Sequence, residues 1–231
     1  MPSLPQPGET NWGNKLNEFL LTGHNIDGTL KGVQNVINVK DFGATGNQND
    51  NVAVAFQAAV DSVPDGGGAI ILIPPGVHRL ETSIIVRDKF IIWQGSGGSG
   101  FGVCEVRCAN NNKLGFLDVD ISDALPTSNP NPAFGVRNLL IRTHEMATIA
   151  SPPLSIAIKY KGEHAILTGT QFSGIIENVS IEGVFNASSA FKIGIDIDNA
   201  SSFVIRDCTI VGANVSIATG EYKLMEHGVR V

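Results

Sequence analysis

The chain has 231 residues, 42% of them hydrophobic, and a formal net charge of −6. This length allows one substantial core, and chains of this size are commonly a single all-β domain. The acidic balance, without a cluster of Lys and Arg, argues against a nucleic-acid partner. No stretch approaches the roughly 18 apolar residues of a membrane span.

The composition favours short strands joined by turns, because only 16% of residues are charged and 26 are glycine. The N-terminus lacks the charged and apolar regions of a secretion signal. The three cysteines, Cys104, Cys108 and Cys208, have no neighbouring His or second Cys pair at zinc-site spacing. They are predicted to be buried free thiols.

Residues 1–34 are predicted to form a leader separate from the rest of the chain. Residues 1–10 carry three prolines and should be extended. A helix beginning at Thr10 or Asn11 then places four apolar side chains on one face: Trp12, Leu16, Phe19 and Leu20. Such a face is expected to contact a partner, either the end of the following domain or another chain.

A second helix is predicted between Asp50 and Val63, with Asp50 or Asn51 as its N-cap and the glycines at 66–68 as its stop. The apolar run Ala69–Ile73 follows and is predicted to be a buried strand. Short strands are then expected at 77–80, 83–86 and 90–93, and the glycine-rich stretch 95–100 is predicted to turn a corner. In this region His78 is interpreted as a packing residue.

Internal repeats predict a solenoid. Ile176–Gly183 matches Ile205–Gly212, 29 residues later, and Val136–Arg142 is a weaker copy 40 residues earlier. A second strand type alternates with the first, at Ser155–Tyr160, Lys192–Ile197 and Glu226–Val231. Two strand types recurring in alternation indicate successive rungs with loops of unequal length.

The repeats align Asn138, Asn178 and Asp207, which are predicted to stack at one corner, because Asn and Asp tolerate turn geometry and bond along a stack. The last repeat stops in mid-rung at Val231. An uncovered strand would be a template for aggregation, so further residues or another subunit are expected to cover this end.

The stretch Ile37-Asn-Val-Lys-Asp-Phe-Gly-Ala-Thr-Gly46, with Gln57–Asp61 and Gly66–Gly76, resembles the N-terminal signature of the pectate-lyase-like proteins. That group includes polysaccharide lyases, glycoside hydrolases and phage tailspikes. The resemblance implies an all-β fold, a right-handed single-stranded parallel β-helix over residues 35–231, with an N-terminal capping helix after the leader 1–34. Consecutive aspartates usual in the pattern are replaced by Asn51 and Val52, where a helix cap is more expected than catalysis.

The leader also carries a resemblance. Pro7-Gly-x-Thr-Asn-Trp-Gly13, with Leu16-Asn17 and Asp27–Leu30, is similar to a leader of phage tail fibres and spikes. This similarity implies a virion component that is a homotrimer and contacts other tail or baseplate proteins through residues 1–34. The contact residues would be those of the apolar face: Trp12, Leu16, Phe19 and Leu20.

Two pairs of carboxylates are candidates for catalysis, because enzymes on this fold use outward-facing acids with Arg, Lys or calcium as helpers. Asp196 and Asp198 are two residues apart on one strand, as are Asp118 and Asp120. However, the repeats align Asp196 between Lys159 and Arg230, which a solvated charge ladder explains without catalysis. No metal site or cofactor is predicted, although calcium is compatible with the acids near 118–123.

Three hypotheses follow. The first is a phage tailspike or tail-fibre component that attaches to host surface polysaccharide, as the N-terminal part of a depolymerase or without cleavage. The second is a polysaccharide lyase or glycoside hydrolase acting alone, located outside the cell by a route without a signal peptide; the scarcity of Trp and Tyr, two of each, weighs against it. The third is a non-catalytic structural adaptor in a tail.

Overall fold

The protein was analysed as a computed structural model. The structure describes residues 35–97, 104–108, 115–121, 133–143, 154–162, 173–183, 191–198, 202–211 and 227–231. The leader 1–34, with the proposed contact residues Trp12, Leu16, Phe19 and Leu20, lies outside the described residues. The described residues from 36 onward belong to one unit, residues 36–231.

The described residues form strands, one 3-10 helix and one α-helix. The helices are η1 (Val39–Phe42) and α2 (Ala53–Asp61). The strands are β1 (Asn35–Asn38), β2 (Gly68–Ile73), β3 (Gly76–Leu80), β4 (Ile84–Arg87), β5 (Phe90–Gly95), β6 (Cys104–Cys108), β7 (Leu117–Asp120), β8 (Ala133–Thr143), β9 (Leu154–Lys161), β10 (Ser173–Glu182), β11 (Phe191–Asp198), β12 (Ser202–Arg206), β13 (Thr209–Val211) and β14 (His227–Arg230).

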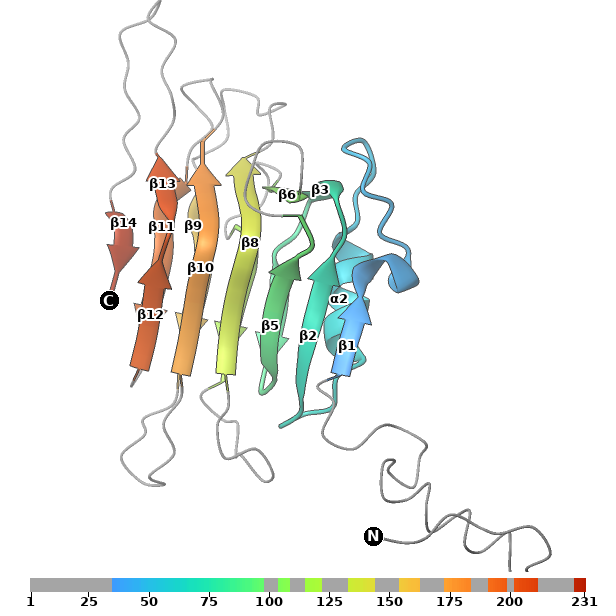
Figure 1. Ribbon diagram of the computed structural model, residues 1–231, viewed down its shortest axis with the longest axis horizontal. Helices are drawn as coiled ribbons and strands as arrows, with labels where there is room; N and C mark the ends of the chain where they lie inside the picture. The colour runs from blue at the N-terminus through green and yellow to red at the C-terminus, as the bar shows by residue number, and fades with distance from the viewer. Residues whose placement is uncertain are drawn as a thin grey trace, which may run out of the picture. The chain divides into compact units, whose positions relative to one another are not determined.

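These strands form a parallel β-helix with three walls, as the sequence predicts. The first wall runs β1-β2-β5-β8-β10-β12, and Figure 1 shows its strands side by side. The second wall contains β3, β6, β13 and the C-terminal halves of β8 and β10. The third wall runs β14-β11-β9-β7-β4. Because β8 and β10 bend between the first and second walls, one continuous strand serves both.

The strand register confirms the internal repeats. In the first wall Ile176 pairs with Val136 and with Ile205, and in the third wall Ile193 pairs with Ile156 and His227. All of these pairs are parallel, so each rung lies directly on the previous one. Repeated apolar positions therefore become continuous buried rows, which is why a solenoid can be stable with few charged residues.

The predicted corner ladder is also confirmed. Asn138, Asn178 and Asp207 have φ angles of 55°, 52° and 54°, in the left-handed region. The side-chain amide of Asn178 donates from Nδ2 to Oδ1 of Asn138 over 2.8 Å. Asn and Asp adopt this backbone conformation at lower cost than other non-glycine residues, so these side chains permit the bend that turns the first wall into the second.

The core between the walls is apolar and aromatic near the N-terminal end. Trp93 is fully buried and stacks on Phe56 of α2, with ring centroids 5.9 Å apart, and meets Phe116 edge-on at 5.2 Å. Cys104 and Cys108 are buried free thiols, whereas Cys208 is only partly buried. Burial raises the pKa of the Cys104 thiol to about 12, because the thiolate would lose its hydration.

The helix α2 covers the start of the third wall, and its N-cap differs from the prediction. The cap residue is Val52, one position later than expected, and the Asn51 side chain accepts from the backbone N–H of Ala53. Asp50 instead accepts from the hydroxyl of Thr45. Asn51 also accepts from the N–H of Glu81, so its amide oxygen joins the helix start to the end of β3.

Gln57 of α2 takes the place of a neighbouring strand for β4. Its Oε1 accepts from the N–H of Ile85 and its Nε2 donates to the carbonyl of Ile85, both over 2.9 Å. One side-chain amide therefore satisfies both groups that a preceding rung would otherwise bind. This arrangement protects the exposed edge of the wall.

His78 is a buried packing residue, as interpreted from the sequence. Its ring lies 5.5 Å from that of Phe56, measured between centroids, and Nε2 lies 2.9 Å from the carbonyl oxygen of Pro74. A neutral ring that donates from Nε2 fits this contact. Burial lowers the pKa of His78 from 6.5, because the charged imidazolium would lose its hydration.

The free energy of unfolding should therefore fall as the pH drops below about 6.5, the ordinary pKa of histidine. Below that pH the unfolded chain binds a proton that the folded chain rejects, so full stability is present above it and is lost on acidification, with a slope of up to about 1.4 kcal/mol per pH unit. Urea unfolding between about pH 8 and pH 5 measures the slope. The His78→Phe variant should show a smaller slope, and an unchanged slope would contradict the assignment.

Candidate functional site

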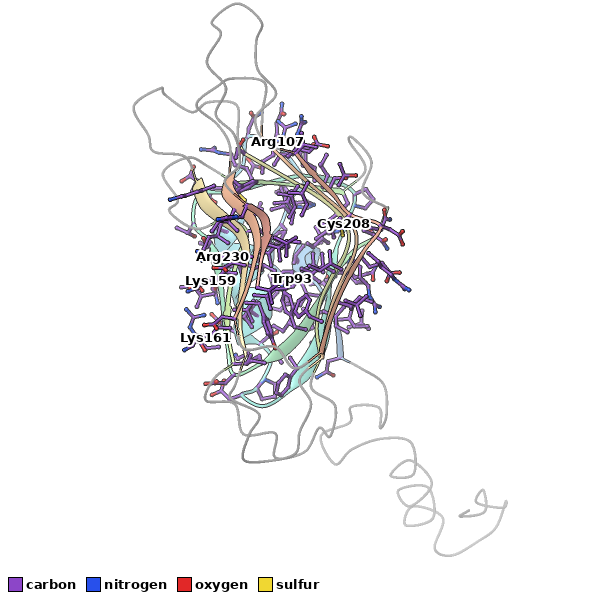
Figure 2. The ribbon with its side chains drawn as sticks, turned by 90° about the vertical axis from the view of Figure 1, so that its left-hand side faces the viewer. Trp93, Arg107, Lys159, Lys161, Cys208 and Arg230 are labelled. Atoms are coloured by element: carbon purple, nitrogen blue, oxygen red, sulfur yellow. The ribbon has the colours of Figure 1, made fainter. Side chains whose placement is uncertain are left out.

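The outer side of the third wall carries eight charged side chains in two rows, here called the charged face: Arg87, Asp118, Asp120, Lys159, Lys161, Asp196, Asp198 and Arg230. They lie at alternate positions on their strands, so all project to the same side. In Figure 2, Lys159, Lys161 and Arg230 lie on one flank of the coil, away from Cys208, with Trp93 between the walls.

Charge on this face alternates from strand to strand. β4 contributes a cation, β7 two carboxylates, β9 two lysines, β11 two carboxylates and β14 a cation. The register places Asp118 beside Lys159, Lys159 beside Asp196, and Asp196 beside Arg230. The predicted plus, minus, plus ladder around Asp196 is confirmed and extends one strand further to Asp118.

Asp118 lies between two cations. Its Oδ2 accepts from Nη2 of Arg87 over 2.8 Å, and its Oδ1 lies 3.3 Å from Nζ of Lys159. Arg87 also donates to the backbone carbonyl of Asp118 over 2.7 Å. The carboxylate is held from both neighbouring rungs, so its position is fixed more firmly than that of a solvated surface acid.

Asp196 forms a two-pronged pair with Arg230. Nε and Nη2 of the guanidinium donate to Oδ1 and Oδ2 over 2.7 and 2.5 Å. The hydrogen bonds and charge of Asp196 raise the pKa of Arg230. The second row is looser: Lys161 lies 3.3 Å from Oδ2 of Asp120, and Asp198 pairs in register with Lys161 and is exposed.

The two signs differ in their depth on this surface. The four cationic side chains are 38–52% exposed, whereas those of Asp118 and Asp196 are 11% and 12% exposed. In the row of Asp118 and Asp196 the cations are therefore more exposed than the carboxylates, whereas in the second row Asp120 is 29% exposed and Asp198 is exposed. Exposed guanidinium and ammonium groups suit an anionic ligand.

The structure brings the sequence candidates onto one face but not into one catalytic pair. Asp118 and Asp120 lie on β7, Asp196 and Asp198 lie on β11, and the lysines of β9 stand between them. A catalytic role for any of these acids stays a prediction. Asp123 and the following loop lie outside the described residues. In the part of the chain that the structure describes, no three His, Cys, Asp or Glu side chains are grouped to hold a metal ion.

Sequence reasoning missed the roles of Arg87 and Lys161, because the rungs containing β4 and β7 do not resemble the later repeats. It also missed a charged cluster on the second wall. There Glu105 is fully buried, 2.5 Å from Nε of Arg107 and 3.8 Å from Nη1 of Arg142. The i, i+2 spacing of Glu105 and Arg107 was a signal for the first of these contacts.

Comparisons with known proteins place the fold in a family. A family model described as rhamnogalacturonase A/epimerase, pectate lyase-like, matches residues 36–229. A mannuronan C5-epimerase of Azotobacter vinelandii is 27% identical over 119 residues, which is 48% of this chain and 13% of that protein.

Among solved structures, the ORF18 protein of Geobacillus virus E2 aligns with a TM-score of 0.41 and 15% identity. The alignment covers 87% of this chain and 35% of the viral one. The chain thus spans 13% of the epimerase and 35% of the viral protein. No helix within the described ranges is long and apolar enough to cross a membrane.

Proposed function

Because the chain belongs to the rhamnogalacturonase A/epimerase, pectate lyase-like family, we propose that it binds an acidic polysaccharide of a host surface through the charged face, as part of a phage tailspike or tail fibre. The observation that carries the proposal is the set of four partly exposed cations on the third wall: Arg87, Lys159, Lys161 and Arg230. The side chains of Arg87, Lys159 and Lys161 are 38–45% exposed, and each pairs with a carboxylate of β7.

The family and the relative support an acidic polymer. The matched epimerase takes its name from mannuronan, a polymer with a carboxylate on each sugar. Carboxylates are the groups that Arg and Lys recognise by charge-assisted hydrogen bonds. Within each row the cations lie on alternate strands, roughly 10 Å apart, and so present repeated contacts to a repetitive chain.

The place in a virion rests on the leader. The resemblance of residues 7–30 to leaders of tail fibres and spikes supports attachment to tail or baseplate proteins, and a homotrimer is part of the same proposal. Analytical ultracentrifugation of the whole chain and of a chain lacking residues 1–34 would test the trimer. A monomer in both cases would contradict it.

The glycan proposal predicts that Lys159→Ala/Lys161→Ala weakens binding of polymannuronate about tenfold, because two charge-assisted contacts are lost. Isothermal titration at low and high salt measures the effect, and affinity should fall with salt. The matched control is Lys40→Ala/Arg206→Ala, which removes the same charge from exposed sites outside the face. Equal weakening in both variants would show that the loss of affinity comes from the change in net charge and not from these two lysines.

Catalysis by this chain is the second candidate, favoured by the match to an epimerase. Lyase action would create unsaturated uronates with ultraviolet absorbance, hydrolysis would create reducing ends, and epimerisation would change the sugar composition. If a product forms, Asp118→Asn and Asp196→Asn decide whether either ion-paired acid takes part. Binding without any product would favour attachment alone.

A further inference from the structure

A shallow apolar cavity lies at the N-terminal end of the charged face. It has a volume of about 620 Å³ and is formed by one side of α2, the turn after β3 and the first half of β4. Its apolar lining includes Val54, 78% exposed, and Ile85, 47% exposed. Volumes of this size are typical of sites for small ligands or for one group of a larger ligand.

The cavity is continuous with the charged face. Ile85 occupies the position on β4 that Asp118 occupies on β7, and Lys159 on β9, so all three lie in one row. Arg87 is two residues further along β4 on the same outer side, roughly 7 Å away along the strand. A polymer that lies across the third wall in contact with its cations would therefore reach an apolar hollow near Arg87.

The polar groups in the wall of this cavity are largely engaged within the protein. Both ends of the Gln57 amide bond to the backbone of Ile85, and Nε2 also donates to Oδ1 of Asp61 over 3.0 Å. The hydroxyl of Ser83 donates to the carbonyl of Gly115. The surface left for a ligand is thus mainly the carbon of Val54, Ile85 and the neighbouring alanines.

We propose that this cavity is a subsite for an apolar substituent, an ester-linked acetyl group, on a uronate whose carboxylate pairs with Arg87. The inference rests on the proposed function and adds a chemical class to it. Two contacts with Asp118, from Nη1 and Nη2, fix the position of the Arg87 guanidinium. The side chain is still 45% exposed, so a ligand carboxylate can reach it. An unmodified uronate would pair with Arg87 but leave the exposed Val54 and Ile85 in water.

The experiment compares binding of O-acetylated and de-acetylated polymannuronate by isothermal titration. We expect the whole chain to bind the acetylated polymer about fivefold more tightly, the factor that burial of about one methyl group contributes. Val54→Asp should abolish this preference, so that the variant binds both polymers equally, while its added carboxylate weakens the binding of both. Val204→Asp makes the same substitution at an exposed valine on β12, outside the cavity, and should retain the preference.

The outcomes separate the two proposals. Equal binding of both polymers by the whole chain, or a preference that survives in Val54→Asp, overturns the subsite while the charged face stands. Binding of neither polymer overturns the proposed function and the subsite with it. Circular dichroism of each variant checks that α2 and the coil remain folded.

Discussion

Replacing Gly95 by alanine is expected to destabilise the coil by about 3 kcal/mol or more, the range of overpacked or strained buried sites. Gly95 ends β5 at the corner, one rung before Asn138. A Cβ atom there would lie far inside contact distance of the backbone oxygen of Asn138 and 2.8 Å from Cδ2 of Leu139. Because the nearest obstacle is backbone, relief requires the two rungs to separate.

Urea unfolding of Gly95→Ala measures this loss. The control is Gly228→Ala on β14, where an added Cβ would meet only Cγ2 of Ile210, at the ordinary distance of 3.9 Å. That change should be neutral or slightly stabilising, since alanine restricts the unfolded chain more than glycine does. Equal effects of the two substitutions would show that the corner is not closely packed.

Removal of the Asp118 carboxylate is the second change with a large expected effect. Asp118→Ala should cost about 2–3 kcal/mol, somewhat below the usual cost of breaking a fully buried pair because Arg87 and Lys159 are partly exposed. The variant removes the anion that lies between two cations, Arg87 on β4 and Lys159 on β9. The loss should shrink at high salt, because ions screen the remaining repulsion.

Asp120→Ala is the matched control on the same strand. Asp120 is more exposed and lies 3.3 Å from Lys161, so its removal should cost less than about 1 kcal/mol. Thermal unfolding at low and high salt compares the two variants. A larger effect at Asp120 than at Asp118 would contradict the view that the inner carboxylates organise the face.

The sequence predicts the fold best where the rungs repeat. The copies around Val136, Ile176 and Ile205 give both the wall and the register, because each apolar position must lie above an equivalent one. The corner at Asn138 and Asn178 is predictable for a similar reason, since few residues accept its backbone geometry. The alternation around Asp196 follows from the same alignment.

The remaining features of the fold and of the charged face depend on contacts between residues outside the internal repeats, so no alignment of repeats predicts them. A cap at Asn51 is predictable from the sequence, but its second contact, with the N–H of Glu81 just after β3, leaves no periodic signal. Arg87 and Asp118 meet through rungs whose sequences differ from later copies, and the long segments between rungs hide their register. The pairing of Glu105 with Arg142 likewise joins distant residues on different strands.

The strand-by-strand alternation of charge has a consequence for the order in which rungs assemble. A chain built from similar rungs can misfold by leaving one out, so that a strand docks on the next but one. If β11 docked directly on β7, Asp196 and Asp198 would face Asp118 and Asp120, placing carboxylates against carboxylates. Omission of β9 would thus be disfavoured by repulsion between like charges. The alternation of charge therefore favours docking of each rung on the rung that precedes it in the sequence.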